Sequence, residues 1–374
     1  MKILLTAKQR GSTNVLAPVA RELQARGHEL TVYATGNENE AAGFDKLTYE
    51  RIAPADDQYP QLVCGYDTVI VGMSGSQTSD GYFLRAANAS GIPTVAVQDQ
   101  NSLYQERLGI NPADLPTILA VMDNDCVEKV RTELSGEMGT EAAKRCRIVG
   151  WAAFDHYAAL RENFSEQQRE DLLHRLGLNS AQPLCFYPTQ NIHPESAYMQ
   201  RSSMSAEDKK NFFKYESTVT QAVFETASAL GVKLVIKPHP GEEYTTNFTK
   251  ELADRYDFVY LPAKACSTQE LMLASRSVTA GRSTCLTEAT LLDKNVGAIL
   301  PDAMGREWSS ASPAVTLNAI PVTYDWDSTQ DVLEQVTSVD ETVARKLAEN
   351  RKRFSVDGKA SKRLADLIEG LGGQ

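Results

Sequence analysis

Long apolar segments are absent from this 374-residue sequence. Without a run of about 18 or more apolar residues, no segment is expected to cross a membrane as a helix. The apolar stretch at residues 2–7 ends before Lys8 and Arg10, so it is too short for the core of an export signal. We therefore expect a cytoplasmic protein, and we interpret residues 2–7 as a first buried strand.

Informative patterns of cysteine and histidine are also missing. The six cysteines never lie within four residues of one another, which leaves neither a zinc-type spacing nor a redox pair. His156, His174 and His193 form no metal-binding spacing with carboxylates. We expect reduced thiols, no metal site and no bound cofactor.

Positive charge is scarce overall, because the formal net charge is −11 at pH 7. An extended nucleic-acid surface needs a net basic face, so we expect no nucleic-acid partner. Small basic clusters at residues 209–210 and 351–353 leave a peripheral membrane contact open, although solvated helix faces are the simpler interpretation. The sequence does not indicate an oligomeric state.

Two nucleotide-binding signatures are missing as well, the G-x-G-x-x-G fingerprint and the P-loop, which argues against a standard dinucleotide enzyme and a P-loop kinase. The sequence contains instead an alternation of apolar, strand-like runs with helix-like segments. Such runs predict parallel sheets covered by helices on both faces. The expected strands are residues 2–7, 30–35, 67–71, 93–98, 117–122 and 147–150, and then 184–187, 232–236, 258–261, 277–280 and 296–300.

The alternation restarts after a capping-box signature formed by Ser165 and Gln168. This predicts an α/β protein with two Rossmann-like, doubly wound parallel-sheet domains that face an interdomain cleft. We assign residues 1–155 to an N-terminal domain and residues 165–355 to a C-terminal domain. The C-terminal helix of residues 356–374 is a candidate to pack back on the N-terminal domain.

Helical spacing of apolar residues predicts several helices whose bounds can be checked. A second capping-box signature, Ser267 with Glu270, predicts the start of a short helix. The other helices used below are one over residues 125–138, a long one over about 206–230, one over residues 284–292 and two within residues 328–370.

The strongest local motif is Lys237-Pro238-His239-Pro240, which directly follows an expected strand. The prolines cannot continue a central strand, so Lys237 and His239 are predicted at the carboxyl end of the sheet, where open α/β sheets bind ligands. A lysine and an imidazole there suit a phosphate group. The alternative is a proline-stiffened surface turn with solvated side chains.

A second motif, Gly281-Arg282-Ser283-Thr284, follows the strand 277–280 and opens a helix. Free backbone N–H groups at a helix start favour an anion, and Gly281 allows a close approach. Ser283 can equally be an ordinary helix cap. We expect this motif to lie beside Lys237 and His239, on adjacent parallel strands.

Two further positions extend this candidate site. Glu288, one turn into the same helix, can accept hydrogen bonds from ribose hydroxyls, or it can be a carboxylate favoured by the helix dipole. Thr189 and Gln190 follow the first strand of the C-terminal domain and should border the cleft, although polar residues are common in loops.

In the N-terminal domain, two loops follow expected strands. Arg10 and Gly11 belong to the loop after the first strand, and Gly72 and Ser74 belong to a glycine-rich loop after the strand 67–71. Both loops fall on the ligand side of a parallel sheet. We interpret them as acceptor-side loops.

A general base for an acceptor hydroxyl would be a carboxylate at this edge. Asp99, just past the strand 93–98, is our candidate, with a turn or capping role as the alternative. Asp80 and Glu106 are its competitors.

These motifs resemble a known group of enzymes. The opening MKILLTA…PVARELQARGHELTVYA resembles that of GT-B fold glycosyltransferases, and VIKPHP resembles the phosphate-contacting motif of bacterial sialyltransferases, CDP-glycerol glycerophosphotransferases and capsule-type transferases. The segment TAGRSTCLTEATLLDKNVGAIL looks like their following Ser/Thr–Glu helix. RIVGWAAFD at 147–155 is similar to the segment that enters the second lobe of epimerase-like members, with Trp151 and Ala152 where a proline-containing turn is usual. DGKASKRLADLI at 357–368 resembles the terminal helix of surface-polysaccharide enzymes.

The resemblance implies roles for specific residues. The N-terminal domain would bind the acceptor, and the C-terminal domain would bind the nucleotide-linked donor. Glu288 would lie near the ribose, and catalysis would need no metal ion. The donor phosphates would be held by Lys237, His239, Arg282, Ser283 and Thr284.

We therefore expect a cytoplasmic, inverting glycosyltransferase of polysaccharide biosynthesis, a hexosyl- or sialyl-type enzyme. Its donor would be UDP- or CMP/CDP-linked, its acceptor a glycan or small molecule, and its catalytic residues Asp99 and His239. One alternative is a nucleotide-sugar 2-epimerase or hydrolase that uses the same donor pocket. Another is a non-catalytic, two-lobed ligand-binding protein.

Overall fold

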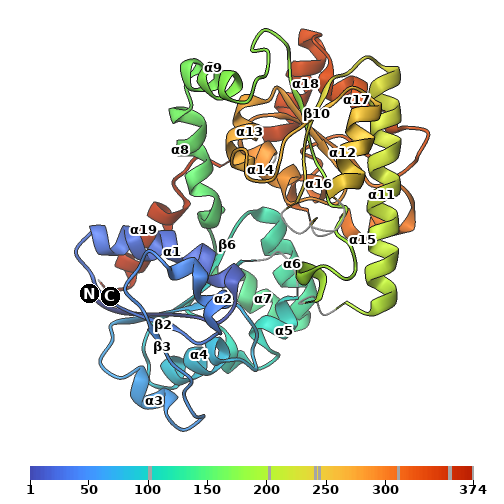
Figure 1. The fold of residues 1–374 in the computed structure, drawn as a ribbon. Coiled ribbons are helices and arrows are strands. Elements are labelled where there is room, and N and C mark those ends of the chain that lie inside the picture. The colour runs from blue at the N-terminus through green and yellow to red at the C-terminus, as the bar shows by residue number, and fades with distance from the viewer. Residues whose placement is uncertain are drawn as a thin grey trace. The chain divides into compact units, whose positions relative to one another are not determined.

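The computed structural model describes residues 1–99, 103–200, 204–239, 242, 246–309, 312–352 and 356–372. The chain divides into two compact units (Figure 1). The first consists of Met1–His156 together with Val356–Gln374, and the second consists of Tyr157–Ser355.

The first unit is built on a seven-stranded sheet in which every strand pairs in parallel with its neighbours. The strand order runs outward in both directions from β1 and β4, so the chain changes direction between these two strands, which is where such sheets bind ligands. In spatial order the strands are β3 (Glu50–Arg51), β2 (Glu29–Ala34), β1 (Lys2–Ala7), β4 (Thr68–Gly72), β5 (Thr94–Val97), β6 (Ile118–Val121) and β7 (Cys146–Ile148).

Strand β1 shows why a continuous apolar run forms a central strand here. Ile3 and Leu5 belong to the core on one face of the sheet, whereas Leu4 belongs to the core on the other face. Successive side chains of a strand point to opposite faces, so a strand covered on both faces must be apolar throughout. The short apolar run that begins the sequence is therefore a strand, as predicted.

Helices surround this sheet, and one prediction about them is wrong. The expected single helix over residues 125–138 is two helices, because Ser135 and Gly136 adopt positive φ angles of 52° and 54°, which no α-helix tolerates. The helical elements of this unit are α1 (Arg10–Ala25), α2 (Glu38–Ala41), η1 (Ala42–Phe44), α3 (Tyr59–Leu62), α4 (Ser79–Ala89), α5 (Tyr104–Leu108), η2 (Pro112–Asp114), α6 (Asn124–Leu134), α7 (Gly136–Arg145), η3 (Ala152–Phe154) and α19 (Ala360–Leu371).

The C-terminal helix α19 packs beside α1 in the first unit, so the two ends of the chain lie close together (Figure 1). Leu364 and Ile368 are fully buried in the same core as α1. The carboxylate of Asp155 accepts the backbone N–H groups of Ala360 and Ser361, at 3.0 and 2.8 Å, and so caps the helix from a distant part of the sequence. Two of the motifs that carry the family resemblance thus contact each other.

The second unit contains a six-stranded sheet whose strands are again parallel. Its order has the same form as that of the first sheet, and the change of direction lies between β8 and β11. In spatial order the strands are β10 (Val259–Tyr260), β9 (Leu234–Lys237), β8 (Cys185–Pro188), β11 (Ser277–Ala280), β12 (Asn295–Ile299) and β13 (Val322–Thr323).

The helices of the second unit confirm both capping boxes, in which Ser165 and Ser267 accept backbone N–H groups at their helix starts. The described part of residues 328–370 holds three helices, α17, α18 and α19, rather than the two predicted, because α18 ends before α19 joins the first unit. The helices are α8 (Asp155–Asn163, begun in the first unit), α9 (Glu166–Arg175), α10 (Ala197–Gln200), α11 (Ala206–Ala229), α12 (Thr246–Arg255), α13 (Thr268–Ala274), α14 (Cys285–Leu291), α15 (Asp302–Ser309), α16 (Pro313–Thr316), α17 (Thr329–Thr337) and α18 (Glu341–Arg351).

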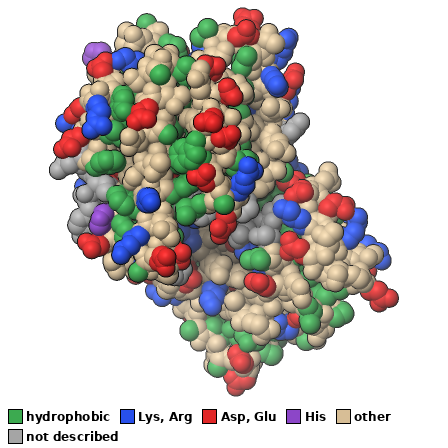
Figure 2. All heavy atoms as spheres, turned by 90° about the vertical axis from the view of Figure 1, so that its right-hand side faces the viewer, with side chains coloured by type: hydrophobic (Ala, Val, Ile, Leu, Met, Phe, Trp, Pro, Cys, Tyr) green, Lys and Arg blue, Asp and Glu red, His purple; other side chains and the backbone are tan. Residues whose placement is uncertain are grey.

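The prediction of two Rossmann-like, parallel-sheet domains is therefore confirmed. Among the described helices, none is both long and apolar enough to cross a membrane. On the face shown in Figure 2, acidic and basic side chains intermingle, and no large area of one charge dominates it.

Candidate functional site

In the second unit, the predicted donor residues follow three strands that lie side by side. Lys237 ends β9, Thr189 follows β8 and Gly281 follows β11. We predicted that β9 and β11 are adjacent, which is wrong, because β8 lies between them and pairs with both. The loop after β8, the weakest of the three signals in the sequence, therefore occupies the centre of the candidate site.

Lys237 is buried at the carboxyl end of β9. Only 5% of the residue is exposed, and its ammonium group donates a hydrogen bond to the hydroxyl of Thr268, at the start of α13, at 3.1 Å. Within the part of the chain that the structure describes, this ammonium group forms no ion pair with a carboxylate. A buried charge without an opposite charge is costly, so the position suits an anion supplied from outside the chain.

His239 lies two residues beyond Lys237 and is half-buried. Burial, and then the positive charge of Lys237, lower the pKa of its imidazole, so the ring is neutral at pH 7 in the ligand-free protein. A phosphate bound beside it would favour the protonated ring instead. Pro240, the last residue of the predicted turn, lies outside the described residues.

Glu242, which the sequence analysis did not single out, joins the loops after β8 and β9. Its carboxylate is buried, and it accepts the Thr189 hydroxyl at 2.7 Å, the His239 backbone N–H at 3.0 Å and the Thr249 hydroxyl at 3.2 Å. Burial raises the pKa of this carboxyl, and these hydrogen bonds oppose the rise. Thr189 therefore positions the His239 loop through Glu242, while Gln190 beside it is partly exposed.

The turn at residues 281–284 lies against a second buried carboxyl, that of Glu216 on α11. A side chain at Gly281 would place its Cβ atom 3.1 Å from a Glu216 oxygen, so glycine allows this approach. The backbone N–H of Arg282 donates to the Glu216 carboxylate, and the Arg282 guanidinium lies over the ring of Phe212, 5.5 Å from its centre. The buried carboxyl group of Glu216 therefore anchors the backbone of this turn.

Glu216 is 2% exposed, and one of its oxygens has no hydrogen-bond partner in the described structure. Burial raises its pKa to about 8, against the opposing effects of the Arg282 N–H group and guanidinium, so the group is protonated at pH 7. A sequence signal for it exists, because Glu216 falls on the apolar stripe of α11 between Phe212 and Val219. An acidic residue in such a stripe indicates a buried carboxyl.

The helix that follows this turn, α14, uses part of the motif for its own structure. The Ser283 hydroxyl accepts the backbone N–H of Cys285 at 3.2 Å, as expected for the capping alternative, whereas Thr284 makes no side-chain cap. Glu288 is half-buried, and this partial burial raises the pKa of its carboxyl, whereas hydrogen bonds from Tyr157 and Thr284 oppose the rise. A ribose would therefore have to share Glu288 with the Tyr157 hydroxyl.

In the first unit, the predicted acceptor-side residues meet at the carboxyl ends of β1, β4 and β5. The Ser12 hydroxyl donates to Asp99 at 3.0 Å and lies 3.3 Å from the Ser74 hydroxyl. The other Asp99 oxygen pairs with Arg107, and both of these side chains are almost fully buried. The candidate base is thus already neutralised by an arginine, which the sequence analysis missed because α5 gives no periodic signal for it.

The two predicted glycines of this region have packing roles. A Cβ atom at Gly11 would lie 2.5 Å from an Asp99 oxygen, and one at Gly72 would lie 2.5 Å from the Ser12 Cβ atom. Both positions therefore require glycine for the close approach of Asp99 and Ser12. Arg10 is exposed at the start of α1.

Asp80, the first competitor of Asp99, is 1% exposed and accepts the Ser74 backbone N–H at 3.2 Å. Burial raises its pKa to about 7, the nearby Asp99 charge adds to this effect, and hydrogen bonds from Ser74 and Lys8 oppose it. A carboxyl that titrates near neutral pH is well matched to general base catalysis. Asp80 is therefore a stronger rival than its position in the sequence suggested.

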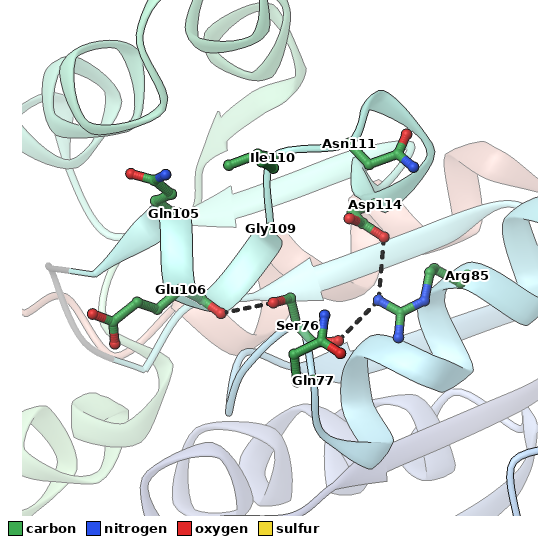
Figure 3. A pocket seen from close by; sticks show the side chains of 9 residues that line it. All are labelled: Ser76, Gln77, Arg85, Gln105, Glu106, Gly109, Ile110, Asn111 and Asp114. Carbon is green, nitrogen blue, oxygen red and sulfur yellow. Dashed lines mark hydrogen bonds and ion pairs between the residues drawn. The ribbon is translucent and has the colours of Figure 1, made fainter.

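A cavity of about 780 Å³ lies beside α5 in the first unit (Figure 3). Arg85 donates to the Ser76 carbonyl oxygen at 2.8 Å and pairs with Asp114 at 3.2 Å, so its charge is balanced. Glu106, the second competitor of Asp99, points away from this pair (Figure 3). The lining has one basic residue, two acidic residues and six uncharged ones, and it consists of Ser76, Gln77, Arg85, Gln105, Glu106, Gly109, Ile110, Asn111 and Asp114.

Within the described residues, no group of three or more histidine, cysteine or acidic side chains could hold a metal ion. In the second unit, positive groups that an anion could contact stand at the end of β9 and on the turn after β11. The first unit offers hydroxyls, amides and carboxyls.

No family model matches the chain, and no curated protein matches it in sequence. Solved structures match over nearly its whole length. A UDP-GlcNAc 2-epimerase from Neisseria meningitidis, bound to UDP-GlcNAc, has a TM-score of 0.65 at 14% identity and covers 99% of this chain and 100% of its own. MurG from Acinetobacter baumannii has a TM-score of 0.58 at 12% identity and covers 99% of both chains. CalG4, the calicheamicin glycosyltransferase, has a TM-score of 0.54 at 11% identity and covers 100% of this chain and 98% of its own.

These neighbours share the GT-B fold of two Rossmann-like domains, which is the fold of this chain. They include both transferases and epimerases. At this level of identity the likeness establishes the fold and not the activity.

Proposed function

We propose that this chain is an inverting glycosyltransferase that uses a UDP- or CMP/CDP-linked sugar donor. The acceptor is a glycan or small molecule, and the reaction belongs to surface-glycan synthesis. The resemblance of the motifs to bacterial transferases supports this, as do the fold neighbours, one of which has UDP-GlcNAc bound. The mechanism assigns no role to a metal ion.

One observation carries the proposal. The ammonium group of Lys237 is buried at a strand's carboxyl end and forms no ion pair with a carboxylate of the described chain. The turn at residues 281–284 begins two strands away in the same sheet, and strands in a sheet are about 4.8 Å apart. Two strand spacings, about 10 Å, exceed the separation of two linked phosphates. The side chains of Lys237 and His239 would therefore extend toward the turn to hold the phosphate or phosphates of one donor.

The chemistry then divides between the two units. In the first unit a carboxylate removes the proton of the acceptor hydroxyl, and the acceptor oxygen attacks the anomeric carbon of the sugar. The bond from that carbon to the phosphate oxygen breaks, and its electron pair stays on the leaving nucleotide. Lys237, His239 and the backbone N–H groups of residues 281–284 stabilise this negative charge, which is the larger electrostatic contribution.

Asp99 is the proposed base, and Asp80 is the alternative that the structure brings into view. Asp99 accepts a hydroxyl hydrogen bond from Ser12 and so sits where an acceptor hydroxyl could replace it. Burial raises the pKa of Asp80 to about 7, and the residue is only 1% exposed. The variants Asp99→Asn and Asp80→Asn separate the two, because only loss of the base should lower kcat while leaving the Kd for the nucleotide unchanged.

The test begins with nucleotide binding. Thermal-shift and calorimetric titrations with UDP, CMP, CDP and GDP should find one nucleotide that raises the melting temperature, because a ligand of the native state stabilises it. Product analysis then follows with the matching sugar nucleotides, with and without an acceptor panel. Sugar transfer that requires an acceptor supports the proposal, and absence of binding to all four nucleotides contradicts it.

A second candidate is a 2-epimerase or hydrolase that uses the same donor pocket. The similarity to UDP-GlcNAc 2-epimerases over the whole chain favours it. It predicts an altered or free sugar from the donor alone, at a rate that an acceptor does not change. Nucleotide binding with no turnover under any of these conditions would instead support the non-catalytic, two-lobed binding protein.

A further inference from the structure

A second cavity, of about 470 Å³, lies in the second unit at the edge of the sheet opposite to the candidate donor site. Arg276 and Lys294 line it, and each immediately precedes a strand, β11 and β12 respectively. Lys237 and Gly281 lie at the carboxyl ends of their strands. Because all strands of this sheet are parallel, the two sites are at opposite edges and cannot share a ligand.

The lining of this cavity is strongly positive. Arg161 from α8 and Arg169 from α9 join Arg276 and Lys294, and the acidic residue of the lining is Glu166. The net lining charge is therefore +3, in a protein whose formal net charge is −11. Four cations from four separate segments thus line one cavity, although the chain as a whole is acidic.

The simplest explanation is that these cations cap helix ends, where backbone carbonyl groups concentrate partial negative charge. Lys294 donates to the Leu273 carbonyl oxygen at 2.6 Å, and Arg169 donates to that of Ala274 at 3.1 Å, both at the end of α13. Carbonyl groups do not neutralise a full charge, and each guanidinium has five N–H donors. The other two cations, Arg161 and Arg276, donate to the carbonyl oxygens of Leu291 and Ser338 respectively. Two of the cations also have acidic partners, because Arg161 pairs with Asp293 at 3.2 Å and Arg169 pairs with Glu166 at 2.7 Å. Arg276 and Lys294 form no ion pair with a carboxylate within the described residues, so their charge is left for another partner.

The cations also disfavour one another. Burial, followed by the charge of Arg169, lowers the pKa of Lys294 to about 8, and Arg351 on α18 lowers it further, whereas Asp293 and Glu166 act in the opposite direction. Arg351 itself has a buried Nε atom without a hydrogen-bond partner in the described structure. An anion in the cavity would relieve this repulsion.

We propose that this cavity binds the phosphate group of a small phosphorylated metabolite, at a site separate from the donor site. Arg276 supplies a guanidinium group whose planar N–H donors can engage two oxygens of a phosphate at once, and Lys294 supplies a compact positive charge beside it. The volume falls in the range of about 300–1,000 Å³ that is typical of small-molecule sites, and it exceeds the needs of a bare phosphate. Phe164 and Pro183 line the cavity as well and offer an apolar wall to the rest of the ligand.

The test is calorimetric titration with inorganic phosphate and with a hexose 6-phosphate, and the free hexose serves as the ligand control. All titrations use a Lys237→Met background, which weakens phosphate binding at the candidate donor site, so that the measured affinity reports mainly on the second cavity and does not depend on the donor proposal. Lys294→Met should weaken the binding of both phosphates at least 10-fold. Lys233→Met is the matched control, because Lys233 precedes β9 at the same edge of the sheet but does not line the cavity.

The result that overturns the proposal is equal affinity of the Lys294→Met and Lys233→Met proteins, or no binding of either phosphate at millimolar concentration. If inorganic phosphate and the hexose phosphate bind with equal affinity, the site recognises phosphate alone, and the proposal of a larger phosphorylated ligand is wrong. If Lys294→Met does not fold, Arg276→Gln replaces it, because Arg276 lines the cavity and pairs with no carboxylate within the described residues. The affinity should also fall as pH rises through about 8, where Lys294 loses its proton, and this dependence should vanish in Lys294→Met.

Discussion

The two units contain similar sheets, but they differ in whether the buried charges at the strand ends have partners of opposite charge. In the first unit the buried carboxylate of Asp99 pairs with Arg107, and Arg85 pairs with Asp114. In the second unit Lys237 has no carboxylate partner in the described chain, and Glu216 is kept neutral by burial. A buried charge that its own fold leaves unbalanced is suited to a charged ligand, whereas a balanced one is suited to a neutral ligand or to structure. This difference is the reason for proposing the second unit as the place of the anionic donor.

The largest effect should come from breaking the balanced pair of the first unit. Arg107→Gln leaves the Asp99 carboxylate buried without its cation, which costs about 3–5 kcal/mol when one partner of a buried pair is removed. Urea denaturation monitored by circular dichroism measures this loss. The double variant Asp99→Asn, Arg107→Gln should recover much of it. If the single variant is as stable as the wild type, the pair is not a structural element of this unit.

The same kind of change in the second unit should affect binding rather than stability. Lys237→Met removes an unbalanced ammonium group, so we expect little loss of stability but about 10- to 100-fold weaker nucleotide binding, from the loss of a charged hydrogen bond. Calorimetry gives the Kd. Lys233→Met, an exposed lysine before the same strand, is the control and should bind like the wild type. A nucleotide affinity unchanged by Lys237→Met would remove the contrast between the units.

Glu216 gives a pH-dependent test of the second unit. Its pKa is raised from the ordinary value of 4.5 to about 8, so the native state holds a proton that the unfolded state loses between these values. Its contribution to stability is therefore complete below pH 4.5 and is lost as pH rises toward 8, with a slope of at most about 1.4 kcal/mol per pH unit. Glu216→Gln should remove this slope, which denaturation at a series of pH values would measure. Identical slopes in the variant and the wild type would show that Glu216 does not hold a proton.

Sequence patterns predict the capping boxes, the two-domain fold and every described strand except β3 and β13, because these depend on local periodicity. The two missed strands are two residues long and lie at sheet edges, so they have too few residues to show a period. The order of strands within a sheet is not local, so the sequence wrongly predicts that β9 and β11 are neighbours although β8 lies between them. The partners of the site residues were missed for the same reason. Arg107 reaches Asp99 from a short helix, and Glu242 reaches Thr189 from a loop more than 50 residues away in sequence. Among these partners, only Glu216 could be identified from the local sequence, because it is an acidic residue in an apolar helical stripe.

The smallest effect, and the sharpest probe of the unbalanced charges in the second unit, concerns His239. Burial and Lys237 lower its pKa in the free protein, and a bound phosphate should raise it, so nucleotide binding should be accompanied by proton uptake. The affinity is then expected to fall a few-fold as pH rises through the usual histidine range, around 6.5. The nucleotide's terminal phosphate titrates in the same range, so the informative quantity is the difference between the wild type and His239→Asn. If both proteins lose affinity equally with pH, the imidazole does not contact the phosphate, and the anionic site reduces to Lys237 and the turn at residues 281–284.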